Sequence, residues 1–320
     1  MKEFNINLIT LNYNDADTTI NFIKQILNYK TIDHIVVVDN QSTDDSFKKI
    51  REITNNKIVL LSSGANKGYG YGNNFGIRYV NEHFDSDFIV IANPDVTFKE
   101  ETLNSICDIL TQNERAVMAS AVMTDAYGNK QINTAWRSLS PLAFILNEEA
   151  LIHRIFKLNR YSNLFNNNLN VKKVDCLAGS FFVLKKDKLF EQGIYDENMF
   201  LYCEEDYLGL RLKQEGRSAL LLLNKNFMHI HGQTINKAYS KTKQDKLIFK
   251  NEIYLLQNYM DASKLTVNFA KAFFNFCIAE RFLLMSLDLV ECASRASVRN
   301  KKPPAMRVGD KDYIKMASFA

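Results

Sequence analysis

The first half of the chain alternates short apolar runs with segments of helical periodicity, and this alternation limits the possible folds more than any other feature. Strands that are apolar on both faces and alternate with helices indicate a parallel sheet covered by helices. The expected strands are Ile6–Thr10, His34–Asp39, Lys57–Leu61, Phe88–Ala92 and Ala116–Met123. The expected helices are Asp15–Leu27, one that runs through Arg51 after capping residues in Ser42–Asp45, Tyr71–Phe84 and Lys99–Gln112. The chain is therefore predicted to have an α/β fold.

The second half has a weaker pattern and no internal repeat. Residues 136–170 are rich in asparagine, and we expect a loop and helix insertion there. A strand is expected within Val174–Lys185, a helix at Glu204–Gln214 and a further strand at Leu220–Leu223. Beyond residue 240 the pattern is helical, with two expected helices at Lys241–Met260 and Val267–Ala296.

The C-terminal region is apolar and then basic. Val267–Val290 contains four charged residues, so it is not expected to cross a membrane. It is either a helix packed on the core or an amphipathic helix lying in a membrane interface. From Ala293 to the end, seven Lys/Arg against two Asp/Glu give +5, so the total of +4 leaves about −1 for the rest. We therefore expect no nucleic-acid partner, and the basic tail suits an anionic lipid surface.

Composition narrows the class of protein further. A hydrophobic content of 46% excludes a disordered chain. The five cysteines show no CxxC spacing, which argues against a disulfide-stapled protein and favours free thiols in a reducing cytoplasm. The first residues lack the apolar segment of a secretory signal. We expect a cytoplasmic protein.

Polar residues follow three of the expected strands. Open α/β sheets bind ligands at the carboxyl ends of their strands, so these residues predict a cleft that grips a nucleotide. A carboxylate such as Asp39 can accept hydrogen bonds from a base or a ribose, although it could equally cap the next helix. The candidates are Thr10, Asn12 and Asn14 after the first strand, Asp39 and Asn40 after the second, and Asn93 and Asp95 after the fourth.

A glycine cluster precedes the third expected helix. Of the 12 glycines in the chain, five lie between Gly64 and Gly76, around the sequence NKGYGYGNN that starts at Asn66. Glycine allows the backbone to approach a ligand, and a helix N-terminus attracts phosphate. The spacing excludes a Walker A loop and a dinucleotide fingerprint. A donor-binding loop and a plain turn both remain possible.

Asp95 is a candidate ligand for Mg²⁺ or Mn²⁺, because such ions take few protein ligands and several phosphate or water oxygens. His229 and His231 lie near the end of a later expected strand, and alternate strand residues face the same side. One of them could complete the metal site, or both could be ordinary packing residues.

Three consecutive acidic residues, Glu204, Glu205 and Asp206, open the helix expected at Glu204–Gln214. Acidic residues in a first turn favour the helix dipole, which is the simplest explanation. Their mutual repulsion can also raise one pKa, and a raised pKa suits a general base that activates a hydroxyl group.

Taken in order, these motifs resemble the family 2 glycosyltransferases of the GT-A fold, most closely the bacterial rhamnosyltransferase-type members. The resemblance implies a mixed, mostly parallel central sheet flanked by helices, with a helical C-terminal extension. The matching segments are TLNYN (10–14), VVVDNQSTD (36–44), NKGYGYGNNFGI (66–77), NPDV (93–96), CLAGSFFVLKK (176–186), FLYCEEDYLGLRLKQEG (200–216) and HIHGQT (229–234).

The resemblance also implies roles for individual residues. Asn12, Asp39 and Lys67 would line the nucleotide pocket, together with Gly68 and Asn73 of the same glycine motif. Asp95 matches the metal-binding Asp of the family's DxD motif, whose first Asp is Asn93 here. Gly179 matches the glycine turn on the acceptor side.

Two of the implied roles have alternatives. Aligning the acidic helix on Arg211 makes Glu205 the catalytic base, whereas the literal Glu-Asp pair makes it Asp206. The family's late histidine, followed by xxGx[ST], selects His229 as the metal or diphosphate ligand, with His231 as the alternative.

The expected activity is inverting transfer of a sugar from a nucleotide donor, most closely dTDP-L-rhamnose, with Mg²⁺ or Mn²⁺. The acceptor would be lipid-linked or an oligosaccharide in O-antigen or capsule synthesis, reached at the inner membrane face. A UDP-sugar carrying galactofuranose or an N-acetylhexosamine is the alternative donor. A nucleotidyltransferase and a non-catalytic glycan- or lipid-binding protein are alternative classes. The expected domains are residues 1–240, divided near residue 125 into nucleotide and acceptor halves, and a helical region at residues 241–320.

Overall fold

The computed structural model describes residues 4–53, 55–165, 169–187, 190, 192–230 and 241–299, without the side chains of residues 241, 282 and 284–299. The strands are β1 (Ile6–Asn12), β2 (His34–Asp39), β3 (Ile58–Ser62), β4 (Phe88–Ala92), β5 (Val96–Phe98), β6 (Ala116–Thr124), β7 (Ala135–Trp136), β8 (Val171–Val174), β9 (Cys176–Leu177), β10 (Phe181–Lys185) and β11 (Ser218–His229). The helices are α1 (Ala16–Ile26), α2 (Ser46–Arg51), α3 (Tyr69–His83), α4 (Glu100–Gln112), η1 (Ile132–Thr134), α5 (Pro141–Leu146), α6 (Ala150–Phe156), α7 (Glu204–Gln214), α9 (Lys241–Asn258) and α10 (Lys264–Arg299).

The main sheet has the order β3-β2-β1-β4-β10-β6-β11-β5, and β8 also pairs with β11. Strands β1 to β4 are parallel, as expected from the apolar runs. Strand β10 runs antiparallel between β4 and β6, so the sheet is mixed. The mixed, mostly parallel sheet implied by the resemblance is therefore confirmed. The apolar runs alone did not indicate the antiparallel strand, because they do not record the direction in which a buried strand enters the sheet.

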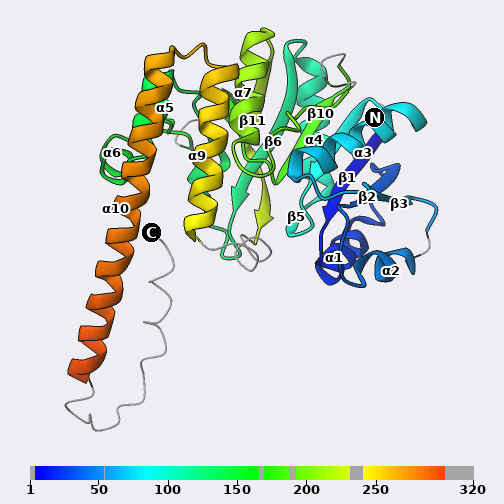
Figure 1. The fold of residues 1–320 in the computed structure, drawn as a ribbon. Coiled ribbons are helices and arrows are strands. Elements are labelled where there is room, and N and C mark those ends of the chain that lie inside the picture. The colour runs from blue at the N-terminus through cyan, green and yellow to red at the C-terminus, as the bar shows by residue number, and fades with distance from the viewer. Residues whose placement is uncertain are drawn as a thin grey trace.

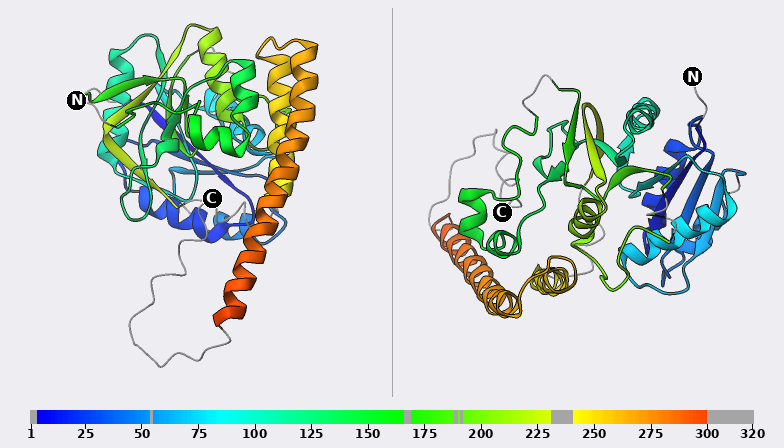
Figure 2. Two further views of the ribbon diagram at one scale, coloured as in Figure 1. Left: turned by 90° about the vertical axis from the view of Figure 1, so that its left-hand side faces the viewer. Right: turned by 90° about the horizontal axis from the view of Figure 1, so that it is seen from above.

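Helices cover both faces of the sheet (Figures 1 and 2). Alternate strand residues point to opposite faces, so one face gathers Leu8 and Val37 against α1 and α4, and the other gathers Ile9 and Val38 against α3 and α7. All four of these strand residues are fully buried. The two-sided burial explains why the strands are continuous apolar runs.

The helices α9 and α10 form a third cluster with the start of α7 and with α5. Phe249 and Leu255 of α9 and Phe274 of α10 pack with Ile145 and Met199. The distal part of α10 extends past the body of the protein (Figures 1 and 2). Within the described residues, no helix is long and apolar enough to span a membrane.

Candidate active site

The ends of β1 and β2 bring the expected nucleotide-binding residues together. Asn12 Nδ2 donates to Asp39 Oδ1 at 2.8 Å, and the Ser42 hydroxyl donates to the same oxygen at 2.6 Å. The backbone N–H of Ser42 donates to Asp39 Oδ2 at 3.0 Å. The backbone N–H of Asn14 donates to the Ser42 hydroxyl at 2.9 Å. Asp39 therefore orders the loops that follow β1 and β2, and it places a carboxylate at the end of β2. Thr10, another expected residue, is fully buried within β1.

The glycine stretch folds as the start of α3 and lies against two other segments. Asn40 Nδ2 donates to the carbonyl oxygen of Gly68 at 3.0 Å. Gly68 has φ = 104°, and a Cβ there would lie 1.9 Å from the carbonyl oxygen of Phe200, so the position requires glycine. The Lys67 ammonium lies 4.9 Å from the centre of the Tyr71 ring. Asn73 Nδ2 donates to the carbonyl oxygen of Tyr69 at 3.1 Å.

Tyr69 connects this loop to the fourth strand and to β10. Its hydroxyl lies 3.1 Å from Asn93 Oδ1 and 2.8 Å from the carbonyl oxygen of Gly179, two acceptors for one proton. Burial, followed by the nearby carboxylates of Glu205 and Glu204, raises the pKa of Tyr69 above its usual range. Tyr69 thus stays a hydrogen-bond donor at neutral pH, and it was not among the residues expected from the sequence.

Asp95 and His229 meet at the edge of the sheet although 134 positions separate them. Strand β5 follows Asp95 and pairs antiparallel with the end of β11, where His229 lies opposite Val96. His229 Nε2 is 3.1 Å from Asp95 Oδ1. A carboxylate oxygen and an imidazole nitrogen are ligands that Mn²⁺ accepts. Among the residues that the structure describes, no group of three or more His, Cys, Asp or Glu side chains could hold a metal ion. His231 lies outside the described residues, as do residues 232–240.

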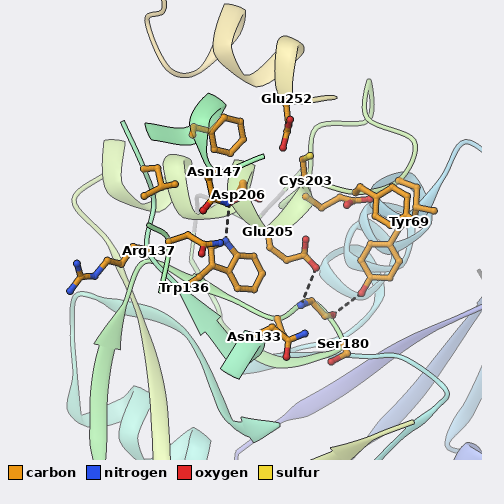
Figure 3. A pocket seen from close by; sticks show the side chains of 18 of the residues that line it. Tyr69, Asn133, Trp136, Arg137, Asn147, Ser180, Cys203, Glu205, Asp206 and Glu252 are labelled. Carbon is orange, nitrogen blue, oxygen red and sulfur yellow. Dashed lines mark hydrogen bonds between the residues drawn. The ribbon is translucent and has the colours of Figure 1, made fainter. Parts of the chain in front are cut away.

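A cavity of about 550 Å³ opens beside these residues. It lies between the start of α7, the turn before β10 and the segment from β7 to α5 (Figure 3). Five carboxyl groups line it, together with Arg137 and His229. These five are Glu148, Glu204, Glu205, Asp206 and Glu252.

The three acidic residues of α7 differ in their surroundings. The backbone N–H of Gly179 donates to Glu205 Oε1 at 3.2 Å, and Trp136 Nε1 donates to Asp206 Oδ1 at 2.9 Å. Burial is the main cause that raises the pKa of each. The pKa of Glu204 reaches about 8 and that of Asp206 about 7, while that of Glu205 is raised against the opposing effect of the Gly179 N–H. All three carboxyl groups therefore titrate above the ordinary range for carboxylic acids.

The turn that presents α7 has an unusual backbone. Tyr202 and Cys203 have φ = 75° and 70°, which non-glycine residues seldom adopt. Asn251 of α9 donates to the carbonyl oxygens of Leu201 and Tyr202 at 2.8 and 2.9 Å, so the helical region holds this turn in place.

Several cavity residues were not predicted from the sequence. Trp136, Arg137 and Glu148 lie in the weakly patterned segment, where no periodicity marks them. Glu252 could have been predicted as a buried acidic residue, because its spacing from Ile248 and Leu255 places it on the apolar face of α9.

The chain matches the family model described as Glycosyl transferase family 2 over residues 8–190, more than half of its length. The chain belongs to glycosyl transferase family 2. This confirms the resemblance drawn from the motifs.

Three curated relatives are similar at low identity. The low-salt glycan biosynthesis hexosyltransferase Agl10 of Haloferax volcanii is 24% identical over 66% of this chain and 62% of its own length. Rhamnosyltransferase WbbL of Escherichia coli K12 is 24% identical over 56% of this chain and 72% of its own length. The N-acetylglucosaminyl-diphospho-decaprenol L-rhamnosyltransferase of Mycobacterium tuberculosis is 23% identical over 61% and 66%. The chain spans less than two thirds of the first and third of these relatives.

Two solved glycosyltransferase structures have a similar fold. GalNAc-T7 with UDP, GalNAc and Mn²⁺ has a TM-score of 0.58 at 11% identity, covering 80% of this chain and 48% of that one. The mannosyltransferase PcManGT from Pyrobaculum calidifontis, in complex with GDP-Man and Mn²⁺, has a TM-score of 0.55 at 14% identity, covering 95% and 82%. The expected GT-A fold, with its mixed sheet and helical C-terminal region, is confirmed.

Proposed function

We propose that this glycosyltransferase moves L-rhamnose, with inversion, from dTDP-L-rhamnose to a hydroxyl of a lipid-linked or oligosaccharide acceptor in O-antigen or capsule synthesis. The observation that carries the proposal is the Glu205 carboxyl, held by the Gly179 N–H on the wall of the acidic cavity. The rhamnosyltransferase names of two relatives support the donor. The third relative is named only as a hexosyltransferase, so a UDP-sugar is the competing donor.

Glu205 is the proposed general base. Once ionised, its carboxylate takes the proton from the acceptor hydroxyl as that oxygen attacks the anomeric carbon from the face opposite the diphosphate. A raised pKa makes the carboxylate a stronger base, which suits abstraction of a hydroxyl proton. Asp206, whose Oδ1 accepts a hydrogen bond from Trp136, is the alternative base. The preference for Glu205 comes from the alignment of the acidic helix on Arg211.

The nucleotide would bind across the ends of β1 and β2. Asp39, held by Asn12 and Ser42, offers oxygens to a base or ribose, and Asn14, Asn40, Lys67, Gly68 and Asn73 surround the adjoining loop. We assign this role to residues 1–125, the acceptor role to residues 126–240, and a supporting role to the helical region from residue 241.

Asp95 and His229 are the proposed ligands for Mg²⁺ or Mn²⁺. They fit the ion in donor chemistry, and a nucleotide diphosphate with water would complete its coordination. When bound, the cation offsets negative charge on the leaving diphosphate. Asn93 in place of an aspartate removes one negative charge from the site, which weakens its hold on a cation.

Peripheral contact with the cytoplasmic face of the inner membrane is proposed for α10. Its outer face carries apolar side chains at heptad-like spacing: Leu265 (81% exposed), Phe269 (45%), Phe276 (58%) and Leu283 (60%). An apolar stripe of this kind can enter a lipid interface. The four cysteines with described side chains are free and buried, in keeping with a reducing compartment.

The test is calorimetric titration with dTDP-, UDP- and GDP-sugars in Mn²⁺ or Mg²⁺, followed by turnover with each donor. We expect dTDP-L-rhamnose to bind most tightly and to be transferred with inversion, which the one-bond C1–H1 coupling of the product reports. Preferred turnover of a UDP-sugar would overturn the donor and leave the glycosyltransferase assignment in place.

A further inference from the structure

A carboxyl group from the C-terminal helical region reaches the catalytic cavity. Glu252 lies on α9, is only 3% exposed, and lines the cavity with Glu205 and Asp206 of α7 (Figure 3). It belongs to neither the acidic helix nor the strand ends that carry the proposed chemistry. A buried acid on a supporting helix needs a reason, because an apolar residue of similar size would pack there without loss of hydration.

The hydrogen bonds around Glu252 determine which of its groups is available to a ligand. Its carboxyl group forms a hydrogen bond with that of Glu148. Glu148 Oε2 accepts from Arg281 Nη2 at 3.0 Å, and Arg281 Nη1 donates to Asp245 at 2.7 Å. Burial, followed by the charges of Glu148 and Asp206, raises the pKa of Glu252 well above its usual range. Two carboxyl groups can share a hydrogen bond only if one of them carries a proton, and the raised pKa of Glu252 supports its carrying that proton.

Oε2 of Glu252 is buried and has no hydrogen-bond partner among the residues that the structure describes. It can accept a hydrogen bond from a ligand in the cavity, and a hydroxyl group is a suitable donor. The residues proposed to hold the nucleotide at the ends of β1 and β2, including Asp39, do not line the cavity, whereas the proposed base does.

We propose that Glu252 forms part of an acceptor subsite, in which its Oε2 accepts a hydrogen bond from a hydroxyl group of the acceptor sugar. This inference rests on the proposed function, since it takes the ligand of the cavity to be the sugar acceptor. It gives α9 a part in choosing the acceptor, in addition to packing against α7.

The chain carries its own reporter for this subsite. Trp136 is the single tryptophan, and it lines the cavity with its Nε1 bound to Asp206. Its emission should change when a sugar enters, whether or not transfer follows. The probes are benzyl N-acetylglucosaminide and N-acetylglucosaminyl-diphospho-decaprenol in detergent, each titrated into the full-length protein with dTDP and Mn²⁺.

Three variants separate the possible roles of Glu252. Glu252→Gln keeps a donor towards Glu148 and a carbonyl towards the cavity, so we expect its affinity for the probes to stay within about twofold of wild type. Glu252→Leu removes the acceptor atom and should raise the Kd of the probes about three- to tenfold, with dTDP affinity unchanged. The control is Gln257→Leu, at an exposed position of the same helix, which should behave as wild type.

Thermal unfolding distinguishes a structural role from a binding role. We expect Glu252→Leu to keep or raise the Tm, because it replaces a buried polar group with an apolar one. A lowered Tm with unchanged probe affinity would assign Glu252 to structure and overturn the subsite. The subsite would also be overturned if none of the probes changed the Trp136 emission of the wild-type protein. Normal probe binding without transfer from dTDP-L-rhamnose would instead overturn only the proposed donor.

Discussion

The backbone N–H of Gly179 lies 3.2 Å from Oε1 of Glu205, and this contact joins the turn before β10 to the first turn of α7. A Cβ at position 179 would lie 2.5 Å from the same oxygen, so the contact depends on glycine. One carboxylate is thereby oriented at the cavity wall while its neighbours in α7 face other partners. This orientation is consistent with the proposed role of Glu205 as the base.

Glu205→Gln should lower kcat for transfer by about 10²- to 10⁴-fold, because the amide cannot take the proton of the acceptor hydroxyl. The affinity for the donor nucleotide, measured calorimetrically, should change little. Asp206→Asn is the matched variant and should retain far more activity. If Glu205→Gln turns over normally and Asp206→Asn does not, the base is Asp206.

The raised carboxyl pKa values predict a pH dependence of stability. An acid whose pKa is higher in the folded than in the unfolded state binds more protons when folded, so stability falls as pH rises between the two values. For Glu204 the window runs from its ordinary value to about 8, and for Asp206 to about 7. We expect the free energy of unfolding, from urea titrations, to decrease between pH 5 and pH 8. Glu204→Gln should flatten this slope, and a slope that is unchanged in the variant would contradict the assignment.

Asp95→Ala should abolish transfer together with any dependence on Mg²⁺ or Mn²⁺, because Asp95 is the only carboxylate in the proposed ion site. His229→Gln should weaken metal affinity less, since it removes no charge. The control is Asp85→Ala, which removes an exposed carboxylate at a distant surface position. Full wild-type activity in EDTA would show that the pair serves another purpose.

Gly68→Ala should disrupt the junction between the glycine loop and residue 200. The added Cβ would lie 1.9 Å from a backbone oxygen of Phe200, and φ = 104° is unfavourable for alanine. We expect a loss of stability of about 2 kcal/mol or more. Gly64→Ala is the control, because φ there is also positive (75°) but nothing lies within 4 Å of the added atom. Similar unfolding midpoints for the two variants would contradict the close approach.

The strands and helices of the first half were predictable because local pattern decides them. The bounds of β2, β4 and α7 agree with the sequence analysis, since each is a continuous apolar run or begins at a clear acidic turn. The direction of β10 was not predictable, because it depends on where the chain re-enters the sheet. The long β11 was underestimated, since its register shifts between Leu222 and Asn226 and polar residues follow there.

The site residues that lie at the ends of strands were predictable from the sequence. Asp39, Asp95 and His229 all lie at or just beyond the ends of strands, and the sheet gathers them. Tyr69 was not predictable, since its hydroxyl acts through contacts with Asn93 and Gly179 that only the tertiary structure creates. Glu252 was overlooked for another reason, because an acidic residue on a helix is normally solvated.

The exposed stripe of α10 gives a direct test of membrane contact. Deleting the whole helix is a poor test, because Val267 and Phe274 on its inner face are buried against the body. Replacing Leu265, Phe276 and Leu283 with Glu changes only exposed side chains. Burial of such side chains contributes about 1.5–3 kcal/mol each when complete, so partial insertion of three should be worth at least tenfold in vesicle affinity. We expect the triple variant to lose that affinity for anionic vesicles in sedimentation, with unchanged activity on a water-soluble acceptor. In the control variant, the exposed residues Asn104, Gln112 and Gln257 are replaced by Glu, which adds the same charge elsewhere on the surface. If the two variants lose vesicle affinity equally, the added negative charge alone explains the loss, and the apolar stripe does not insert.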